Sequence, residues 1–156
     1  MKKLVYIVIL LSATTLFSCT KDAFYEKFNT VDNREWKANQ KAQFTVDVTD
    51  TVTKYDFLIH VRTTTDYKYN NMYLKVGFID PDGVSQSSNI PIQMTGPEGW
   101  LGKNTGSLIT TSYAPWARQN FTKPGTYTFE VEQMMQDSIL FEVTDVGFAI
   151  YESETE

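Results

Sequence analysis

The sequence predicts an all-β protein, a single-domain antiparallel β-sandwich of jelly-roll or immunoglobulin-like type with about seven to eight strands. Aromatic residues make up 14% of the chain, and together with many Thr and Val they favour strands over helices. Short stretches alternate apolar and polar residues with the two-residue period of a strand. Gly, Pro, Asn and Asp separate these stretches, and none has the apolar spacing of a helix over three turns.

Taken in order, strands are expected at residues 44–48, 55–62, 72–78, 90–94, 108–111, 126–131, 140–143 and 146–151. In the second of these, Phe57 and Ile59 share the inner face, while His60 and Arg62 point to the opposite side. Residues 80–83 and 124–125 carry the Pro and Gly of tight turns. Pro91 cannot donate to a ladder, so the strand at 90–94 is expected at a sheet edge. Residues 63–71 are expected to form a polar loop.

Four glycines between residues 96 and 106 surround Trp100 and Leu101, and this stretch is expected to be a loop. It does not match a phosphate-binding loop, because Pro97 and Asn104 occupy the positions of the required Gly and Ser or Thr. Glycines permit the bends needed to pack Trp100 and Leu101 against another surface. That surface is either the domain's own core or a partner protein.

The amino terminus has the pattern of a secretory signal peptide: two lysines, an apolar run from residue 4 to residue 11, and small residues before a cleavage point. Leu16-Phe17-Ser18-Cys19 resembles the lipobox of bacterial lipoproteins, in which the cysteine receives a diacylglyceryl group. Cys19 is the only cysteine, which favours lipidation over a chance neighbour of the cut. We therefore expect a signal peptide at 1–18, a tether and anchor segment at 19–38 in which Trp36 is the anchor, and the sandwich domain at 39–156.

Loss of Lys2 and Lys3 with the signal lowers the 14 basic residues to 12 against 19 acidic ones, so the formal charge changes from −5 to −7. This acidity argues against nucleic acid as a partner and against electrostatic docking on anionic lipid. Membrane attachment would then come from acyl chains, such as palmitate, at Cys19. The expected location is the cell envelope, exported and lipid-anchored, with the outer membrane favoured over the inner.

No catalytic residue, metal site or cofactor is expected. His60 and Cys19 are each the only residue of their type, which leaves no Cys/His zinc set and no Cys–His nucleophile pair. His60 is interpreted as a structural or surface residue. Paired carboxylates such as Glu130 with Glu132 are interpreted as solvated strand faces, although a hydrolase with two acids at a fixed separation stays an alternative.

Aromatic side chains could also stack on sugar rings, but core or interface packing is favoured for most of them. The candidates are Tyr67, Tyr69, Tyr73, Trp100, Tyr113 and Trp116. Two short segments, residues 50–52 and 137–139, look like the Asp-Ser/Thr-apolar pattern that is O-glycosylated in exported proteins of the Bacteroidetes. They make Thr51 and Ser138 possible glycosylation sites.

Several segments, in their order along the chain, resemble the GldH family of gliding-motility lipoproteins. They are Trp36, residues 55–62 (YDFLIHVR), 66–74 (DYKYNNMYL), 99–103 (GWLGK), 125–129 (GTYTF) with Glu132-Gln133, and the closing segment 146–148. Met135 is followed by Gln136 where the family pattern has Met-Arg. The resemblance extends from the lipobox nearly to the carboxyl terminus.

The resemblance implies a non-enzymatic envelope lipoprotein of Bacteroidetes, a component of the gliding-motility apparatus that is associated with type IX protein secretion. The expected partners are the membrane, through Cys19, and other envelope proteins of that machinery. The candidate partner surface comprises Arg62, Tyr67, Tyr69, Asn71, Trp100 and Lys103. A second hypothesis is a glycan-binding surface lipoprotein of a nutrient-uptake system, which predicts exposed, coplanar aromatic rings on a concave sheet face.

Overall fold

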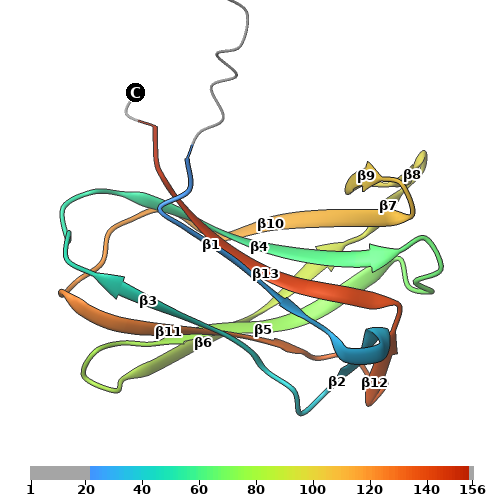
Figure 1. Ribbon diagram of the computed structural model, residues 1–156, viewed down its shortest axis with the longest axis horizontal. Helices are drawn as coiled ribbons and strands as arrows, with labels where there is room; N and C mark the ends of the chain where they lie inside the picture. Colours follow the sequence, from blue (N-terminus) through green and yellow to red (C-terminus); the bar gives the residue numbers. More distant parts are fainter. Residues whose placement is uncertain (1–21, 155–156) are drawn as a thin grey trace, which may run out of the picture.

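The computed structural model describes residues 22–154 and confirms the all-β prediction (Figure 1). Within this range the regular structure is 13 strands and a single 3-10 turn, η1 (Asp32–Arg34). The strands are β1 (Tyr25–Thr30), β2 (Glu35–Lys37), β3 (Ala42–Val48), β4 (Tyr55–Thr64), β5 (Asn71–Ile79), β6 (Ser85–Gln93), β7 (Thr95–Gly96), β8 (Gly99–Trp100), β9 (Lys103–Thr105), β10 (Leu108–Gln119), β11 (Gly125–Gln133), β12 (Ile139–Phe141) and β13 (Val143–Glu152).

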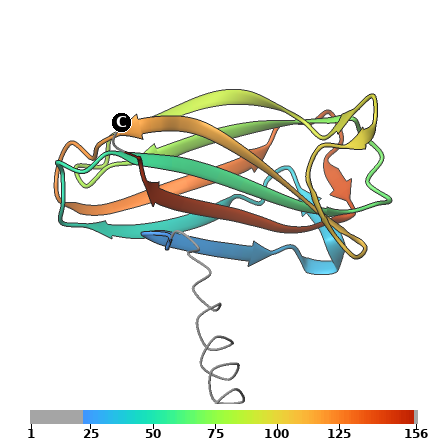
Figure 2. The same cartoon turned by 90° about the horizontal axis from the view of Figure 1, so that it is seen from above.

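Two antiparallel sheets form the two layers of the sandwich. Figure 1 shows one layer above the other, and Figure 2 shows the same arrangement from above. One sheet has the strand order β1-β13-β4-β10-β9 and the other β3-β11-β5-β6. Numbered in chain order, the eight strands of six or more residues give the orders 1-8-3-6 and 2-7-4-5. This is the jelly-roll arrangement of two interleaved Greek keys, so the structure selects the jelly roll over the immunoglobulin-like alternative.

The core lies between the sheets and is built by the predicted alternation. In β4, Tyr55, Phe57, Ile59 and Val61 are all buried, and the same period is seen in β3 and β11. Phe129 of β11 stacks at 4.5 Å between centroids on a ring of β13, that of Phe148. Because the inward rows are apolar in both sheets, burial of their side chains supplies the main stabilisation of the sandwich.

Several element boundaries differ from the prediction. The expected loop at 96–106 contains the last residue of β7 and all of β8 and β9, so that prediction is wrong. β6 is an edge strand, as Pro91 predicted, but it starts at Ser85 and is longer than expected. β4 continues to Thr64, and only the connection 65–70 is irregular. Within the segment expected as tether and anchor, β1 pairs with β13 from Tyr25 onward and Trp36 is 1% exposed.

The two ends of the sandwich differ, and we name them by what they carry. The loop end has the β4–β5 connection (65–70), the β7–β8 hairpin and the two-stranded ribbon of β2 and β12. The pocket end has the β3–β4, β5–β6 and β10–β11 connections (49–54, 80–84 and 120–124) (Figure 1). The chain enters at the pocket end, where the ring of Phe24 lies 5.1 Å from that of Tyr55.

Candidate functional site

The loop end is closed by tyrosines whose hydroxyls have partners. Tyr67 is 5% exposed, and its ring contacts that of Tyr69 at 5.8 Å between centroids. The Tyr67 hydroxyl donates to the carbonyl of Asn71 at 3.4 Å, and the Tyr69 hydroxyl donates to the Asp137 carboxylate at 2.6 Å. Lys68 pairs with that carboxylate at 3.0 Å. The Tyr69 hydroxyl and Lys68 lower the pKa of Asp137, because both stabilise the ionised form.

The segment from β7 to β9 places the side chains of the adjacent residues Trp100 and Leu101 in different environments. Trp100 is half-buried and packs against the core, whereas Leu101 is 60% exposed. Gly102 allows β9 to approach β10, because a Cβ at this position would lie 2.6 Å from the carbonyl oxygen of Thr110. The glycine-rich segment therefore packs Trp100 on the domain's own core and leaves Leu101 accessible to a partner.

Arg62 and Lys103 lie on the outer face of the five-stranded sheet. Both pair in register with Thr110, so they belong to one cross-strand row and are separated by a single strand. The Arg62 guanidinium lies 3.7 Å from the ring centroid of Phe28, a cation–π contact. Phe28 in turn covers Gly147, where no Cβ would fit beneath the ring. This row presents one half-buried and one exposed cation.

His60 also faces outward, on the side of β4 that the sequence predicted, yet it is only 8% exposed. The ring of Phe28 stacks on it at 5.6 Å between centroids, and its Nδ1 lies 2.8 Å from the Ser112 hydroxyl. Burial lowers the pKa of the imidazole, because the charged form loses its hydration. His60 is thus a packed residue of the sheet face.

The structure divides the predicted partner-surface residues into two groups. Tyr67, Tyr69, Asn71 and Trp100 are at the loop end, whereas Arg62 and Lys103 are on the sheet face. Lys103 is exposed, Tyr67 is buried, and the other four are half-buried. Tyr67 is therefore removed from the accessible surface, because its ring belongs to the hydrophobic core and contacts that of Tyr69.

The remaining predicted sites are the lipidation site Cys19 and the glycosylation sites Thr51 and Ser138. Cys19 and the predicted signal peptide lie outside the described residues. Thr51 is half-buried in the β3–β4 connection, beside Val52, whose N–H donates to the Asp50 carboxylate at 2.7 Å. Ser138 is exposed, immediately before β12.

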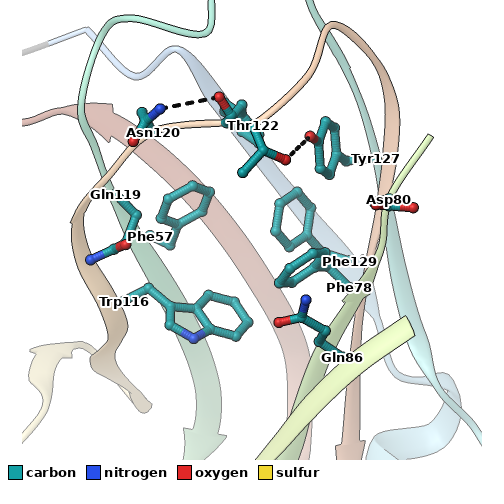
Figure 3. A pocket seen from close by; sticks show the side chains of 11 residues that line it. Phe57, Phe78, Asp80, Gln86, Trp116, Gln119, Asn120, Thr122, Tyr127 and Phe129 are labelled. Atoms are coloured by element: carbon teal, nitrogen blue, oxygen red, sulfur yellow. Dashed lines mark hydrogen bonds between the residues drawn. The ribbon is translucent and has the colours of Figure 1, made fainter. Parts of the chain in front are cut away.

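A pocket that was not predicted from the sequence opens at the pocket end, between the edge strand β6 and the carboxyl-terminal half of β10 (Figure 3). Its volume is about 280 Å³. Six aromatic rings from β4, β5, β10, β11 and the β10–β11 connection form its wall: Phe57, Phe78, Trp116, Phe121, Tyr127 and Phe129. The Trp116 ring stands edge-on to Phe57 and Phe78, with interplanar angles of 86° and 82°.

Polar side chains line the rest of the pocket: Asp80, Gln86, Gln119, Asn120 and Thr122. Asp80 accepts the Val84 N–H at 2.8 Å and pairs with Lys123 at 3.5 Å. The Val84 N–H is the largest of the causes that lower the pKa of Asp80. The Gln86 amide points toward the rings in Figure 3, and it makes no hydrogen bond with any residue between 22 and 154.

A weak signal in the sequence marks this pocket. Four residues of β6 lie opposite inward-facing residues of β5. Two of them, Ile90 and Ile92, are apolar, whereas the two nearer the start of the strand, Gln86 and Ser88, are polar. Gln86 pairs with Phe78, which is itself an inward position. Polar residues on the inner face of an edge strand either protect it from aggregation or serve a ligand. Their significance depends on the strand register, which the sequence alone did not supply.

The described part of the chain contains no group of three or more His, Cys, Asp or Glu side chains that could hold a metal ion. In the same range, no helix has both the length and the apolar character required to cross a membrane.

Comparison with known proteins identifies the family. The family model described as GldH lipoprotein matches residues 23–150, which span both sheets. The chain belongs to the GldH lipoprotein family. The gliding motility lipoprotein GldH homolog of Christiangramia forsetii is 31% identical over 147 residues, which cover 88% of each chain. The gliding motility lipoprotein GldH of Flavobacterium johnsoniae is 27% identical over 154 residues, covering 94% of this chain and 96% of that one.

The jelly roll also resembles part of a solved enzyme structure, a family GH115 4-O-methyl-alpha-glucuronidase with specificity for decorated arabinogalactans. The TM-score is 0.51 at 11% identity, and the likeness covers 90% of this chain and 19% of that enzyme. At this identity the likeness shows the fold alone, because one fold serves many functions.

Proposed function

We propose that this member of the GldH lipoprotein family is a non-enzymatic lipoprotein of the cell envelope that acts in gliding motility and, through that apparatus, in type IX protein secretion. The observation that carries the proposal is the family match over residues 23–150. It is supported by two relatives, named as a gliding motility lipoprotein and its homolog, that align over about nine tenths of their length.

The contacts of the candidate acid–base groups support a role without catalysis. The ring of His60 is covered by Phe28 and shares a hydrogen bond with Ser112. Glu130 is paired with Lys41 at 2.9 Å and accepts from Gln43 at 2.7 Å. A general base has to reach a substrate proton with a free lone pair. The Glu130 carboxylate is engaged within the domain, and the Nε2 of His60, which has no hydrogen-bond partner among the described residues, is buried away from solvent.

Lipidation of Cys19 would set the orientation of the sandwich. Tyr25, the first residue of β1, lies six positions after Cys19, and six extended residues reach at most about 20 Å. Since β1 starts at the pocket end, that end would face the membrane. The loop end, with the exposed Leu101 and the nearby Lys103, would then point away from the lipid, toward protein partners of the machinery. The outer membrane is the proposed location.

The proposal is tested in a gliding relative whose own gene is deleted and then complemented. The unaltered chain should restore surface spreading and export of secreted enzymes, while Cys19→Ala should abolish labelling by an alkynyl palmitate analogue and reduce both phenotypes. A Leu101→Ser, Lys103→Glu double variant should reduce spreading at normal protein level. Asn89→Asp, an exposed change on β6, is the matched control. A deletion strain with normal spreading and normal export would overturn the proposal.

The glycosylation sites remain proposals as well. Ser138 is exposed and Thr51 half-buried, both next to an aspartate. Intact-mass measurement of the chain purified from its native host should show added hexose mass that falls in steps with Ser138→Ala and Thr51→Ala. An unmodified mass in the starting chain would remove both sites.

A further inference from the structure

We propose that the pocket between β6 and β10 binds a neutral sugar, one pyranose ring at the end or at a branch of a glycan. The first reason is the chemistry of its wall. Sugar rings have apolar C–H faces that pack on aromatic rings, and the half-buried Trp116 and Phe78 are the wall residues nearest to solvent. The other four rings are buried and hold these two in place by ring contacts.

The second reason is the polar groups that have no partner. The Gln86 amide and the indole N–H of Trp116 make no hydrogen bond within residues 22–154. Gln119 donates to the carbonyl of Ala117 at 3.0 Å, which leaves its amide oxygen available as an acceptor. Amides both donate and accept, as hydroxyl groups do. A purely apolar ligand, such as an acyl chain, would leave these groups unpaired at a cost.

The third reason is charge. Asp80 is the one carboxylate among the residues lining the pocket, and its oxygens accept the N–H groups of Asp82 and Val84 and pair with Lys123. Lys123 also pairs with Asp82. With its carboxylate engaged in this way, the lining offers no uncommitted ion for a charged ligand, so a neutral one fits better.

The size of the pocket sets the size of the ligand. A volume of about 280 Å³ is at the lower limit for small-molecule sites, which is suitable for a single ring and too small for an oligosaccharide. This geometry differs from the sequence-based hypothesis of a concave sheet face with coplanar aromatics, because Tyr67 is buried and Tyr69, Trp100 and Trp116 are half-buried. Of those four residues, only Trp116 belongs to the proposed site.

The test is NMR titration of the mature chain in a zwitterionic detergent, since maltoside detergents carry a sugar themselves. The probes are methyl pyranosides of glucose, galactose, mannose, xylose and fucose. The three tryptophans give three indole N–H signals. We expect the signal of Trp116 and the side-chain amide of Gln86 to shift and saturate with at least one probe, with a dissociation constant on the order of 1 mM. The signals of Trp36 and Trp100 should not move.

Three variants make the assignment specific. Trp116→Ala should abolish the saturable shift, and Gln86→Ala should weaken binding about tenfold, as expected for one lost hydrogen bond. Asn89→Ala, on the outer face of the same strand, should bind as the unaltered chain does. Should Trp116→Ala fail to fold, the Gln86 and Asn89 pair still decides the question.

Two results would overturn the proposal. One is the absence of a saturable shift with every pyranoside. The other is saturation of the Trp116 signal by decanoate or by a short aromatic peptide, while the sugars leave it unchanged. Neither result bears on motility, because the pocket is separate from the surface formed by Leu101 and Lys103.

Discussion

At the loop end, the Trp36 indole donates to the carbonyl of Gln40 at 2.8 Å, and the hydroxyls of Tyr67 and Tyr69 both have acceptors. At the pocket end, the Trp116 indole and the Gln86 amide have no hydrogen-bonding partner among residues 22–154. Both ends use aromatic residues on the same jelly roll. The difference indicates that the polar groups of these three loop-end side chains are satisfied within the chain, whereas the pocket end keeps polar groups available for a ligand.

The largest expected effect contrasts the two tryptophans. Trp36→Ala removes a side chain that is 1% exposed, and such truncations cost about 3 to 5 kcal/mol. Trp116→Ala removes a half-buried ring that already borders a cavity, so we expect about 1 to 2 kcal/mol. Urea unfolding followed by far-UV circular dichroism measures both. Equal losses would contradict the distinction between the two ends.

The second prediction concerns two glycines of the β7–β9 segment. At Gly102 an added Cβ would lie 2.6 Å from the carbonyl oxygen of Thr110, and backbone cannot move aside easily. We expect Gly102→Ala to lower the free energy of unfolding by about 1 to 3 kcal/mol. At Gly96 the nearest atom is a methyl of Leu101 at 3.0 Å, and this exposed side chain can rotate. Gly96→Ala should therefore change stability less, and the reverse order would refute the close approach of β9 to β10.

The third prediction uses pH to test the polar network of the loop end. The pKa of Asp137 lies below its usual 3.8, so its carboxylate adds stability that is fully present above pH 3.8 and is lost as the pH falls through the lowered pKa. Asp137→Asn should be less stable than the unaltered chain at pH 7, and the difference should shrink between pH 3.8 and pH 2.

Chemical unfolding across that pH range measures the difference. Asp66→Asn, a change to an exposed residue of the β4–β5 connection, is measured in parallel as the control for the loss of one negative charge. A difference between Asp137→Asn and the unaltered chain that stays constant down to pH 2 would mean that the Tyr69 and Lys68 contacts do not stabilise the ionised carboxylate.

The sequence predicted the central strands of the core better than the edge strands, and the reason is physical. Strands such as β4 can be predicted from the local alternation of apolar and polar residues, and the burial of Phe57 and Ile59 confirms the prediction for β4. β1 escaped detection because an edge strand buries little, and its burial pattern has no two-residue period. Burial of His60 depends on Phe28, which lies 32 positions earlier in the sequence and reaches it only through the pairing of β1 with β13.

The pocket could not be predicted from the sequence, because it depends even more on contacts between distant segments of the chain. Its walls come from five separate parts of the chain, and only the jelly-roll order places β6 and β10 on the same side. Trp116 was singled out as a possible sugar-stacking residue, but its partner Gln86 was not. A glutamine in an irregular stretch of Ser, Gln and Asn resembles a turn until its register opposite Phe78 is known.

The smallest expected effect completes the comparison between the ends. The side chain of Gln86 is exposed and makes no hydrogen bond with a residue in the described range, so Gln86→Ala should change the free energy of unfolding by less than about 0.5 kcal/mol. By contrast, Tyr69→Phe should cause a measurable loss, because it removes a 2.6 Å hydrogen bond to Asp137. A negligible effect on stability would agree with the proposed role of the Gln86 amide in binding a ligand. If Gln86→Ala instead destabilised the fold as much as Tyr69→Phe, the amide would be part of the scaffold rather than available to a ligand.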